Sequence, residues 1–411
     1  MISFVGVSAN TGLTRAFRHR PFMWLWFGQT VSSFGDSIHR LALVWWVMQK
    51  TGSGLAMGTV IICSTIPMIP FLLIGGALVD RIGAVRLMLA SDVGRTVMTA
   101  LLAYLVYTDQ LEVWHVYVFA AVFGFASAFF GPASAALKPL IVPKDDLPSA
   151  NSLSALSSQA ASIVGPMLAA AILSFGQSSL AFALDASTFA ISALSLLPLR
   201  GLTPKASGEG GSVIADVRDG MGYVRREPWL WISILAFMVI NPATGPVLVI
   251  VLPYIITQVN HQGASVLAIV EGAAATGTIF AAFWLGRRPP LAKRGLAVYT
   301  WVIVSGLGCI AFGFLRSTYA LAGLAAVVGF SLAALVMVWN NLMQDRVPPD
   351  KLGRVYSIDI MGAIVTQPIG MAVVGWGIDR FSPWAICTIA GGLTIVSAGL
   401  SMLHPQIREI D

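Results

Sequence analysis

The fold is decided by a short stretch that the sequence carries twice, as Val142-Pro143-Lys144-Asp145-Asp146-Leu147 and as Val347-Pro348-Pro349-Asp350-Lys351-Leu352. The copies lie 205 residues apart, about half of the 411-residue chain. The same shift aligns further identical residues on either side of the stretch: Gly124-Phe125 with Gly329-Phe330, Ser152 with Ser357, and Gly165 with Gly370. The sequence therefore predicts a duplicated unit, in which each copy of the stretch joins two equivalent helices.

Long apolar runs lie on both sides of each copy. Charged residues make up 11% of the chain, against about 25% in soluble domains, and the mean hydropathy is +0.79. So few charges cannot cover a water-exposed surface, which excludes a soluble protein. The composition also excludes a disordered, collagen-like or disulfide-based chain. Cys63, Cys309 and Cys387 all lie in apolar runs and are predicted to be reduced core residues.

Twelve of these runs are about 20 residues long, enough to cross the hydrocarbon core of a bilayer as helices. A spanning segment must be helical, because lipid offers no partner for free backbone N–H and C=O groups. The sequence therefore predicts an all-α membrane protein with twelve transmembrane helices. They are predicted at 22–49, 54–79, 86–107, 113–137, 152–176, 179–199, 229–257, 264–286, 296–315, 319–343, 355–378 and 384–403.

The basic residues indicate how the chain is oriented. If the loops alternate between the two sides, twenty Lys and Arg residues fall on the side of the N-terminus and three on the other. Because cytoplasmic loops are enriched in Lys and Arg, both termini are predicted to be cytoplasmic. The first apolar run is too long for a cleaved signal peptide and is interpreted as an uncleaved helix. The net charge of +6 is spread over short loops, which argues against a nucleic-acid partner.

The longest polar segment, 201–228, divides the chain near its middle and is rich in glycine, as linkers are. Valines recur within it at helical spacing: Val213, Val217 and Val224. We expect either a short amphipathic helix on the cytoplasmic face or a solvated linker helix there. One six-helix bundle is predicted at 1–200 and a second at 229–411. Two parallel repeats related by an axis along the membrane normal place a substrate path between them.

The loop after the second predicted helix carries the most specific motif. It reads Gly76-Ala77-Leu78-Val79-Asp80-Arg81-Ile82-Gly83-Ala84-Val85-Arg86. This stretch matches the pattern G-x-x-x-D-R-x-G-x-x-R, and the chain thereby resembles the major facilitator superfamily over nearly its whole length. Gly165-Pro166 resembles the Gly-Pro helix-packing motif of the antiporter branch. Further residues are similar to those of macrolide-efflux proteins and enterobactin exporters: Gln29, Ser33, Asp36, Asp92, Arg95, Asp185 and 223–228.

The resemblance implies a gate at this loop. In the superfamily, the carboxylate at the Asp80 position lies at the N-terminus of a helix that corresponds to 354–378 here, and it locks the cytoplasmic side. Such a contact contributes about 0.3–1 kcal/mol. The alternative is an ordinary solvated loop. The equivalent loop near 286–295 has no aspartate, which argues against a gating role there. The residues expected in the gate are Gly76, Asp80, Arg81, Gly83 and Arg86, with the Asp92–Arg95 pair extending its charge network.

Ionisable residues inside the predicted helices carry functional information, because a charge at mid-bilayer costs at least about 2.5–3.5 kcal/mol unless it faces a cavity or a partner. Asp36 lies about 21 Å along the first helix, near mid-membrane. The 205-residue shift places Asn241 at the equivalent position, where Pro242 and Pro246 are predicted to interrupt the seventh helix. Four polar residues of the first helix share one face: Gln29, Ser33, Asp36 and Arg40.

Asp36 and Glu271 are the two candidates for carrying protons. For Asp36 the alternative is a static pair with Arg40. Glu271 has no basic neighbour in its own helix, the eighth, and is the better candidate. His39 is either a proton relay or a structural histidine, the latter being favoured. For Asp185 a hydrogen bond between helices is expected.

A substrate pocket is expected to combine apolar or aromatic walls with a few amide groups. Anchoring at the membrane interface is the alternative explanation for Trp45 and its neighbour Trp46. The candidates for lining the substrate cavity are Gln29, Ser33, Trp45, Asn241, Trp339, Asn340 and Asn341.

Motifs of other function classes are missing from the sequence. It has no G-x-x-x-x-G-K-[ST] loop for ATP, and no H-E-x-x-H, C-x-x-C or G-x-S-x-G stretch for metal or nucleophilic catalysis. We therefore expect no enzyme activity, no cofactor and no metal. Transport would be driven by an ion gradient or by the gradient of the substrate itself.

Together with the resemblance, these patterns predict a secondary transporter of the bacterial inner membrane that exports an amphipathic organic molecule in exchange for protons. A drug, a macrolide or a siderophore would fit. The expected partners are this small molecule, protons and membrane lipid, and the protein is expected to function as a monomer. Two alternatives remain: a facilitator that flips lysophospholipid-like substrates without proton coupling, and a non-transporting membrane receptor or scaffold.

Overall fold

The computed structural model describes residues 12–201, 221–287 and 291–410. Within these ranges every regular element is a helix, in agreement with the predicted all-α fold. The first half consists of six long helices and three short 3₁₀ helices. They are η1 (Gly12–Arg18), α1 (Arg20–Thr51), α2 (Gly54–Ile82), α3 (Ala84–Tyr107), α4 (Val113–Ile141), η2 (Lys144–Asp146), α5 (Leu147–Ser174), α6 (Ser178–Leu196) and η3 (Leu197–Leu199).

The second half also contains six long helical segments, the first of which runs without a break from Pro228 to Val259. That segment is built from α8 (Pro228–Pro246), a π-helix (Val247–Val251), α9 (Leu252–Tyr254) and a second π-helix (Ile255–Val259). The others are α10 (Ala264–Gly286), α11 (Arg294–Phe312), α12 (Thr318–Arg346), α13 (Pro349–Ile378) and α14 (Pro383–Met402), followed by the short α15 (Pro405–Glu409).

The predicted interruption of the seventh helix at Pro242 and Pro246 is wrong. Both prolines lie within α8, and the chain passes directly into the wider π-helix after Pro246. Proline removes a backbone N–H, and π-helical adjustments and Thr side chains are known ways to satisfy the freed carbonyl groups in membrane helices. The carbonyl groups that lose their N–H donor are those of Met238 and Pro242, and between them the Thr244 hydroxyl donates to the Ile240 carbonyl oxygen at 2.9 Å. The helix therefore continues past the prolines with a local change from α-helical to π-helical hydrogen bonding.

Ten helices among the described residues are long and apolar enough to cross a membrane. The remaining two of the twelve predicted spans correspond to α1 and α2. The helix α1 has 32 residues and carries the polar face noted in the sequence, and α2 runs through residues whose side chains are not described. The chain is thus a multi-pass membrane protein.

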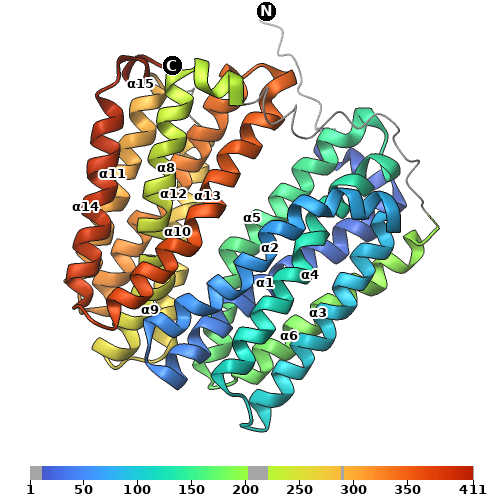
Figure 1. Ribbon diagram of the computed structural model, residues 1–411, viewed down its shortest axis with the longest axis horizontal. Helices are drawn as coiled ribbons and strands as arrows, with labels where there is room; N and C mark the ends of the chain where they lie inside the picture. The colour runs from blue at the N-terminus through green and yellow to red at the C-terminus, as the bar shows by residue number, and fades with distance from the viewer. Residues whose placement is uncertain (1–11, 202–220, 288–290, 411) are drawn as a thin grey trace, which may run out of the picture.

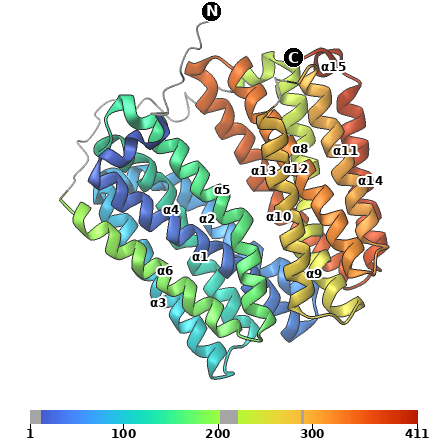
Figure 2. The same ribbon diagram turned by 180° about the vertical axis from the view of Figure 1, so that it is seen from behind.

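Two bundles of six helices lie side by side, α1–α6 in one and α8–α14 in the other. Figures 1 and 2 show them inclined to each other, close together at the end where α9 lies and apart at the end where α15 lies. Two seams join the bundles, α2 against α13 and α5 against α10. The largest buried apolar cluster includes residues from both bundles, among them Trp45, Ile250 and Met371. The molecule is therefore closed by apolar packing at one end.

The predicted linker helix at 213–226 lies mostly outside the described residues. Its last part, 221–226, is helical. Val224 is buried there and packs in an apolar cluster with Trp229 and Leu230. This end of the linker is therefore attached to the second bundle.

The glycines that repeat after 205 residues perform the same task in each bundle. A Cβ on Gly124 of α4 would lie 1.8 Å from the Ser64 carbonyl oxygen of α2, and one on Gly329 of α12 would lie 2.2 Å from the Ala274 carbonyl oxygen of α10. Gly370 approaches the Pro242 carbonyl oxygen of α8 in the same way, whereas Gly165 packs against the Ser37 side chain of α1. Small residues allow membrane helices to pack backbone to backbone. The sequence repeat is thus a repeat of helix crossings.

Replacing Gly329 by alanine should destabilise the second bundle, because α12 and α10 must move apart to admit the methyl group. Overpacking of this kind costs about 1–3 kcal/mol. Gly323→Ala is the matched control on the same helix, since its Cβ would meet no atom within 4 Å. Thermal unfolding in one detergent should show a lower midpoint for Gly329→Ala only, and equal midpoints would contradict the assigned crossing.

Candidate functional site

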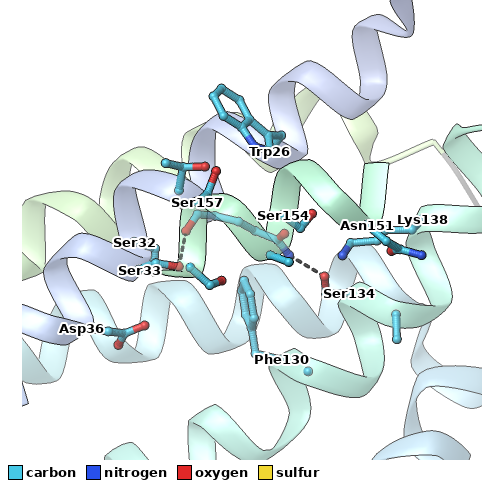
Figure 3. Close-up of a pocket in the computed structure, with 16 residues that line it drawn as sticks. Trp26, Ser32, Ser33, Asp36, Phe130, Ser134, Lys138, Asn151, Ser154 and Ser157 are labelled. Atoms are coloured by element: carbon cyan, nitrogen blue, oxygen red, sulfur yellow. Dashed lines mark hydrogen bonds between the residues drawn. The ribbon is translucent and has the colours of Figure 1, made fainter. Parts of the chain in front are cut away.

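A cavity of about 460 Å³ lies between α1, α4 and α5 of the first bundle (Figure 3). Most of the residues that line it have polar side chains. Figure 3 shows Asp36 toward one end of the cavity, Lys138 and Asn151 toward the other, and the aromatic rings of Trp26 and Phe130 along the sides. The hydroxyl and amide groups that line it belong to Gln29, Thr30, Ser32, Ser33, Ser134, Asn151, Ser154, Ser157 and Ser158.

Hydrogen bonds hold part of this wall in place. The Gln29 Nε2 donates to Ser134 Oγ and so connects α1 to α4. The Ser33 hydroxyl donates to the Gln29 carbonyl oxygen at 2.8 Å. Two of the predicted substrate-cavity residues, Gln29 and Ser33, therefore lie in this cavity beside Asp36.

The cation nearest to Asp36 comes from α3. Arg95 Nη1 lies 3.8 Å from Asp36 Oδ1, whereas Arg40, the partner in the alternative interpretation of Asp36, is exposed. The side chain of Arg95 is only 4% exposed, against 34% for Asp36. A buried guanidinium needs a partner of opposite charge, because removing it from water costs several kcal/mol. Asp36 and Arg95 thus link α1 to α3.

Arg95 is also held from two other directions. Its Nη2 is paired with Asp92 one turn earlier, and Asp92 Oδ2 accepts a hydrogen bond of 2.7 Å from the Ser192 hydroxyl of α6. Aromatic rings surround the guanidinium, the nearest being Phe189 at 4.2 Å and Phe130 at 4.7 Å. Cation–π contacts of this kind favour a fixed arginine. Asp92 and Arg95 therefore form part of a buried network that reaches Asp36 in the first bundle.

A second buried pair lies next to this network. His39 Nδ1 is 3.0 Å from Asp185 Oδ2, although the two groups are not aligned for a hydrogen bond. The imidazole ring stacks on Phe123 with the ring centroids 4.9 Å apart. Both residues are buried, and they connect α1 to α6. This position is consistent with the structural role that the sequence favoured for His39.

Glu271 lines a different cavity, of about 450 Å³, at the seam between the bundles. Its walls come mainly from α10, α12 and the π-helical segment, and α5 of the first bundle contributes Gln159. The lining is mostly apolar, including Leu248, Val270 and Leu332. Within the described part of the chain, Glu271 has no ion-pair partner. The two candidate proton carriers therefore lie in two separate cavities, one rich in polar side chains and one mostly apolar.

The other predicted substrate residues are dispersed. Trp45 is 2% exposed and packs in the apolar cluster that closes the molecule. Trp339 is 6% exposed, and its Nε1 donates to Asp359 of α13 at 3.1 Å. Asn340 lines the Glu271 cavity, where its side-chain oxygen accepts a hydrogen bond from Tyr356. Asn241 is half-buried in α8 and Asn341 is exposed, and neither lines the two cavities described above.

The predicted gating loop is described only in part. The side chains of Gly76, Asp80 and Arg81 lie outside the described residues, although their backbone belongs to α2. Gly83 ends that helix with φ of +93°, a value that favours glycine, and Arg86 is exposed. Gly165, just before Pro166 in α5, packs against the Ser37 side chain of α1.

Comparison with known proteins places this architecture in a family. A sequence profile described as Major Facilitator Superfamily matches residues 25–362. The chain belongs to this superfamily. Macrolide efflux protein A of Streptococcus pyogenes is 24% identical to the transporter over 401 residues, covering 95% of this chain and 97% of that protein. Multidrug efflux pump Tap of Mycolicibacterium fortuitum is 25% identical over 402 residues, with the same coverage.

Solved structures share the fold of the transporter. The nucleoside transporter NupG aligns with a TM-score of 0.68 at 13% sequence identity, covering 93% of this chain and 98% of that one. At so low an identity the likeness concerns the fold alone. Family and relatives together indicate a membrane transporter rather than an enzyme.

Several cavity residues of the transporter were not predicted from its sequence. Asn151, Ser154, Ser157 and Ser158 are spaced as one face of a helix, and this polar stripe lies at the start of the predicted span 152–176. The helical spacing of polar residues, which identified the polar face of α1, would also have identified this polar stripe on α5. Asp359 lies within the predicted span 355–378. A charged residue inside a span indicates a buried partner or a cavity, so this position could also have been singled out from the sequence.

Arg95→Gln should destabilise the transporter strongly, because the buried Asp92 would lose its cation and Asp36, 34% exposed, would lose its partner too. Breaking a buried ion pair from one side costs about 3–5 kcal/mol. Arg40→Gln, which removes an exposed arginine from the same region, should change stability by less than about 1 kcal/mol. Thermal unfolding of both variants in detergent measures the difference. Equal losses would show that Arg40, rather than Arg95, is the important partner.

Proposed function

We propose that the transporter exports amphipathic organic small molecules in exchange for protons by alternating access. The observation that carries this proposal is the pair of cavities, each with one carboxyl group in its wall, in a molecule whose two bundles meet at one end and separate at the other. Relatives named macrolide and multidrug efflux pumps support the class of substrate. The basic loops support an inner-membrane location with cytoplasmic termini.

Glu271 is the proposed proton carrier. Asp36 lies 3.8 Å from the guanidinium of Arg95, which it shares with Asp92, so a proton gained there would have to compete with a fixed cation. No such cation is paired with Glu271 among the described residues, and its surroundings are mostly apolar. An uncompensated charge is costly in such a place. Proton uptake or a cationic substrate would each relieve that cost, which is the basis for exchange.

Glu271→Gln should abolish the coupling between substrate transport and proton movement, whereas exchange of substrate for substrate should continue. Glutamine has nearly the same shape but cannot release a proton. In proteoliposomes loaded with a pH dye, addition of a macrolide should cause proton movement with the parent chain and none with the variant, whereas exchange of labelled for unlabelled macrolide should continue. Glu409→Gln, an exposed change in α15, is the matched control. Unchanged proton movement in Glu271→Gln would contradict the assignment, and transport by the parent chain without any proton movement would contradict antiport.

A set of hydrogen bonds fastens the closed end of the molecule. Asp379, just after α13, accepts from the backbone N–H of Gly54 at 2.7 Å and of Leu55 at 3.1 Å, and also from the Ser53 hydroxyl. These donors belong to the first turn of α2, where a negative charge is favoured by the helix dipole. The contact crosses from the second bundle to the first.

Close backbone contact accompanies this cap. A Cβ on Gly375 of α13 would lie 2.6 Å from the Gly54 carbonyl oxygen, and one on Gly58 of α2 would lie 2.5 Å from the Met371 carbonyl oxygen. With the basic loops in the cytoplasm, this end faces the outside of the cell. Opening to the outside must therefore separate α2 from α13 and break the Asp379 contacts. We propose that Asp379 holds the inward-open state.

Asp379→Asn should shift the transporter toward the outward-open state. Weakening the three charge-assisted contacts by about 1–2 kcal/mol changes the ratio of the two states by about 5- to 30-fold. Spin labels are placed at Gln110 and Ser317, two exposed positions in outer loops of the two bundles. A shift to the outward-open state should increase the share of long distances between the two labels. Asp109→Asn, at a 95% exposed outer aspartate, is the control. An unchanged distance distribution in Asp379→Asn would contradict the proposed latch.

A further inference from the structure

The polar cavity of the first bundle contains hydrogen-bonding groups that the protein itself does not use. The Thr30 hydroxyl is buried and has no partner among the described residues. Within the same part of the chain, Ser32, Asn151, Ser157 and Ser158 have no side-chain hydrogen bond. All five line the cavity. A buried hydroxyl without a partner is costly, which applies to Thr30, whereas Asn151 and Ser158 are exposed and their groups are open to the cavity. This wall is therefore suited to a ligand that supplies hydrogen bonds.

Exposed serines elsewhere in the first bundle bond to their own helices. Ser162 of α5 is exposed, and its hydroxyl donates to the Gln159 carbonyl oxygen of its own helix at 2.8 Å. Ser187 of α6 does the same with Leu184 at 2.6 Å. Serine in membrane helices commonly satisfies its hydroxyl in this way. In the cavity wall, Ser33 and Ser154 also bond to their own helices, whereas Ser32, Ser157 and Ser158 leave their hydroxyls unused within the described part of the chain. One buried hydroxyl outside the cavity, that of Ser127 in α4, is unpaired there as well.

The other residues of the cavity wall indicate which class of ligand fits. Trp26 and Phe130 offer aromatic faces for the C–H surface of a ring. Asp36 can accept, and Lys138 can donate, the stronger charge-assisted hydrogen bonds. Many neutral hydrogen-bonding groups beside aromatic rings suit a polyhydroxylated ring better than a fully charged or fully apolar group. The Glu271 cavity, by contrast, offers mostly apolar side chains.

We infer that the cavity between α1, α4 and α5 binds a polyhydroxylated, sugar-like part of the substrate, while the cavity beside Glu271 takes the apolar part. This inference rests on the proposed function, because it divides one amphipathic substrate between the two bundles. It assigns substrate recognition to Thr30, Asn151 and Ser157, which the efflux proposal itself does not require.

Two fluorescent probes with one aromatic core test the inference. Umbelliferyl β-glucoside carries a sugar, and methoxycoumarin carries a methyl group in its place. Binding is measured by equilibrium dialysis with the full-length transporter in lipid nanodiscs that contain no glycoside detergent. The parent chain should bind the glucoside about tenfold more tightly or better. The double variant Thr30→Val with Ser157→Ala should lower glucoside affinity by about two- to tenfold per lost hydrogen bond and leave methoxycoumarin binding unchanged.

Ser162→Ala is the matched control, because it removes a hydroxyl of α5 that lies outside the cavity and bonds its own helix. Equal binding of the two probes by the parent chain would overturn the inference. So would equal effects of the double variant on both probes, or failure of both to bind. The macrolide-driven proton movement used to test Glu271 does not involve these probes. The efflux proposal therefore stands if that assay succeeds and the sugar site fails, and it falls if that assay fails.

Discussion

Lipid cannot form hydrogen bonds, and this constraint determines most of the structure. Every spanning segment is helical because a helix satisfies its own backbone. Charged groups within the spans must find a partner or a cavity for the same reason. Arg95 illustrates the first solution, with Asp92 and Asp36 on two sides and aromatic rings on the others. Glu271 illustrates the second, in a cavity wall at the seam between the bundles.

The carboxyl groups of the transporter consequently differ in the partners that stabilise their charge. Asp92 and Asp36 neutralise one buried guanidinium and join α1 to α3. Asp185 lies beside His39 within the same bundle. Asp379 instead crosses between bundles at the closed end, where it caps α2. Glu271 alone among these has no ion pair or helix cap in the described part of the chain, which makes its charge the most readily changed.

The duplicated sequence explains how one chain supports both a rigid interior and a moving seam. Within each bundle, repeated glycines bring backbones so close that a single added carbon would collide with the neighbouring helix. Such crossings favour bundles that move as units. Between the bundles, most of the contact is made by the pairs α2 with α13 and α5 with α10. The proposed alternating access would therefore act mainly on these two seams.

The sequence by itself predicted the helical architecture and the polar face of α1, because these depend on composition and on spacing along one helix. It predicted the duplication from the repeat over 205 residues and the superfamily from the resemblance of the loop at 76–86. Only the tertiary structure decided which charges meet. Asp36 and Arg40 are neighbours along α1, yet the partner that lies against Asp36 is Arg95, from a helix two spans later. The unused hydroxyls of α5 and the Asp379 cap also became visible only in three dimensions. Helical periodicity places a side chain on a face, whereas the packing of separate helices, which lipid leaves to small residues and buried polar contacts, decides what that face touches.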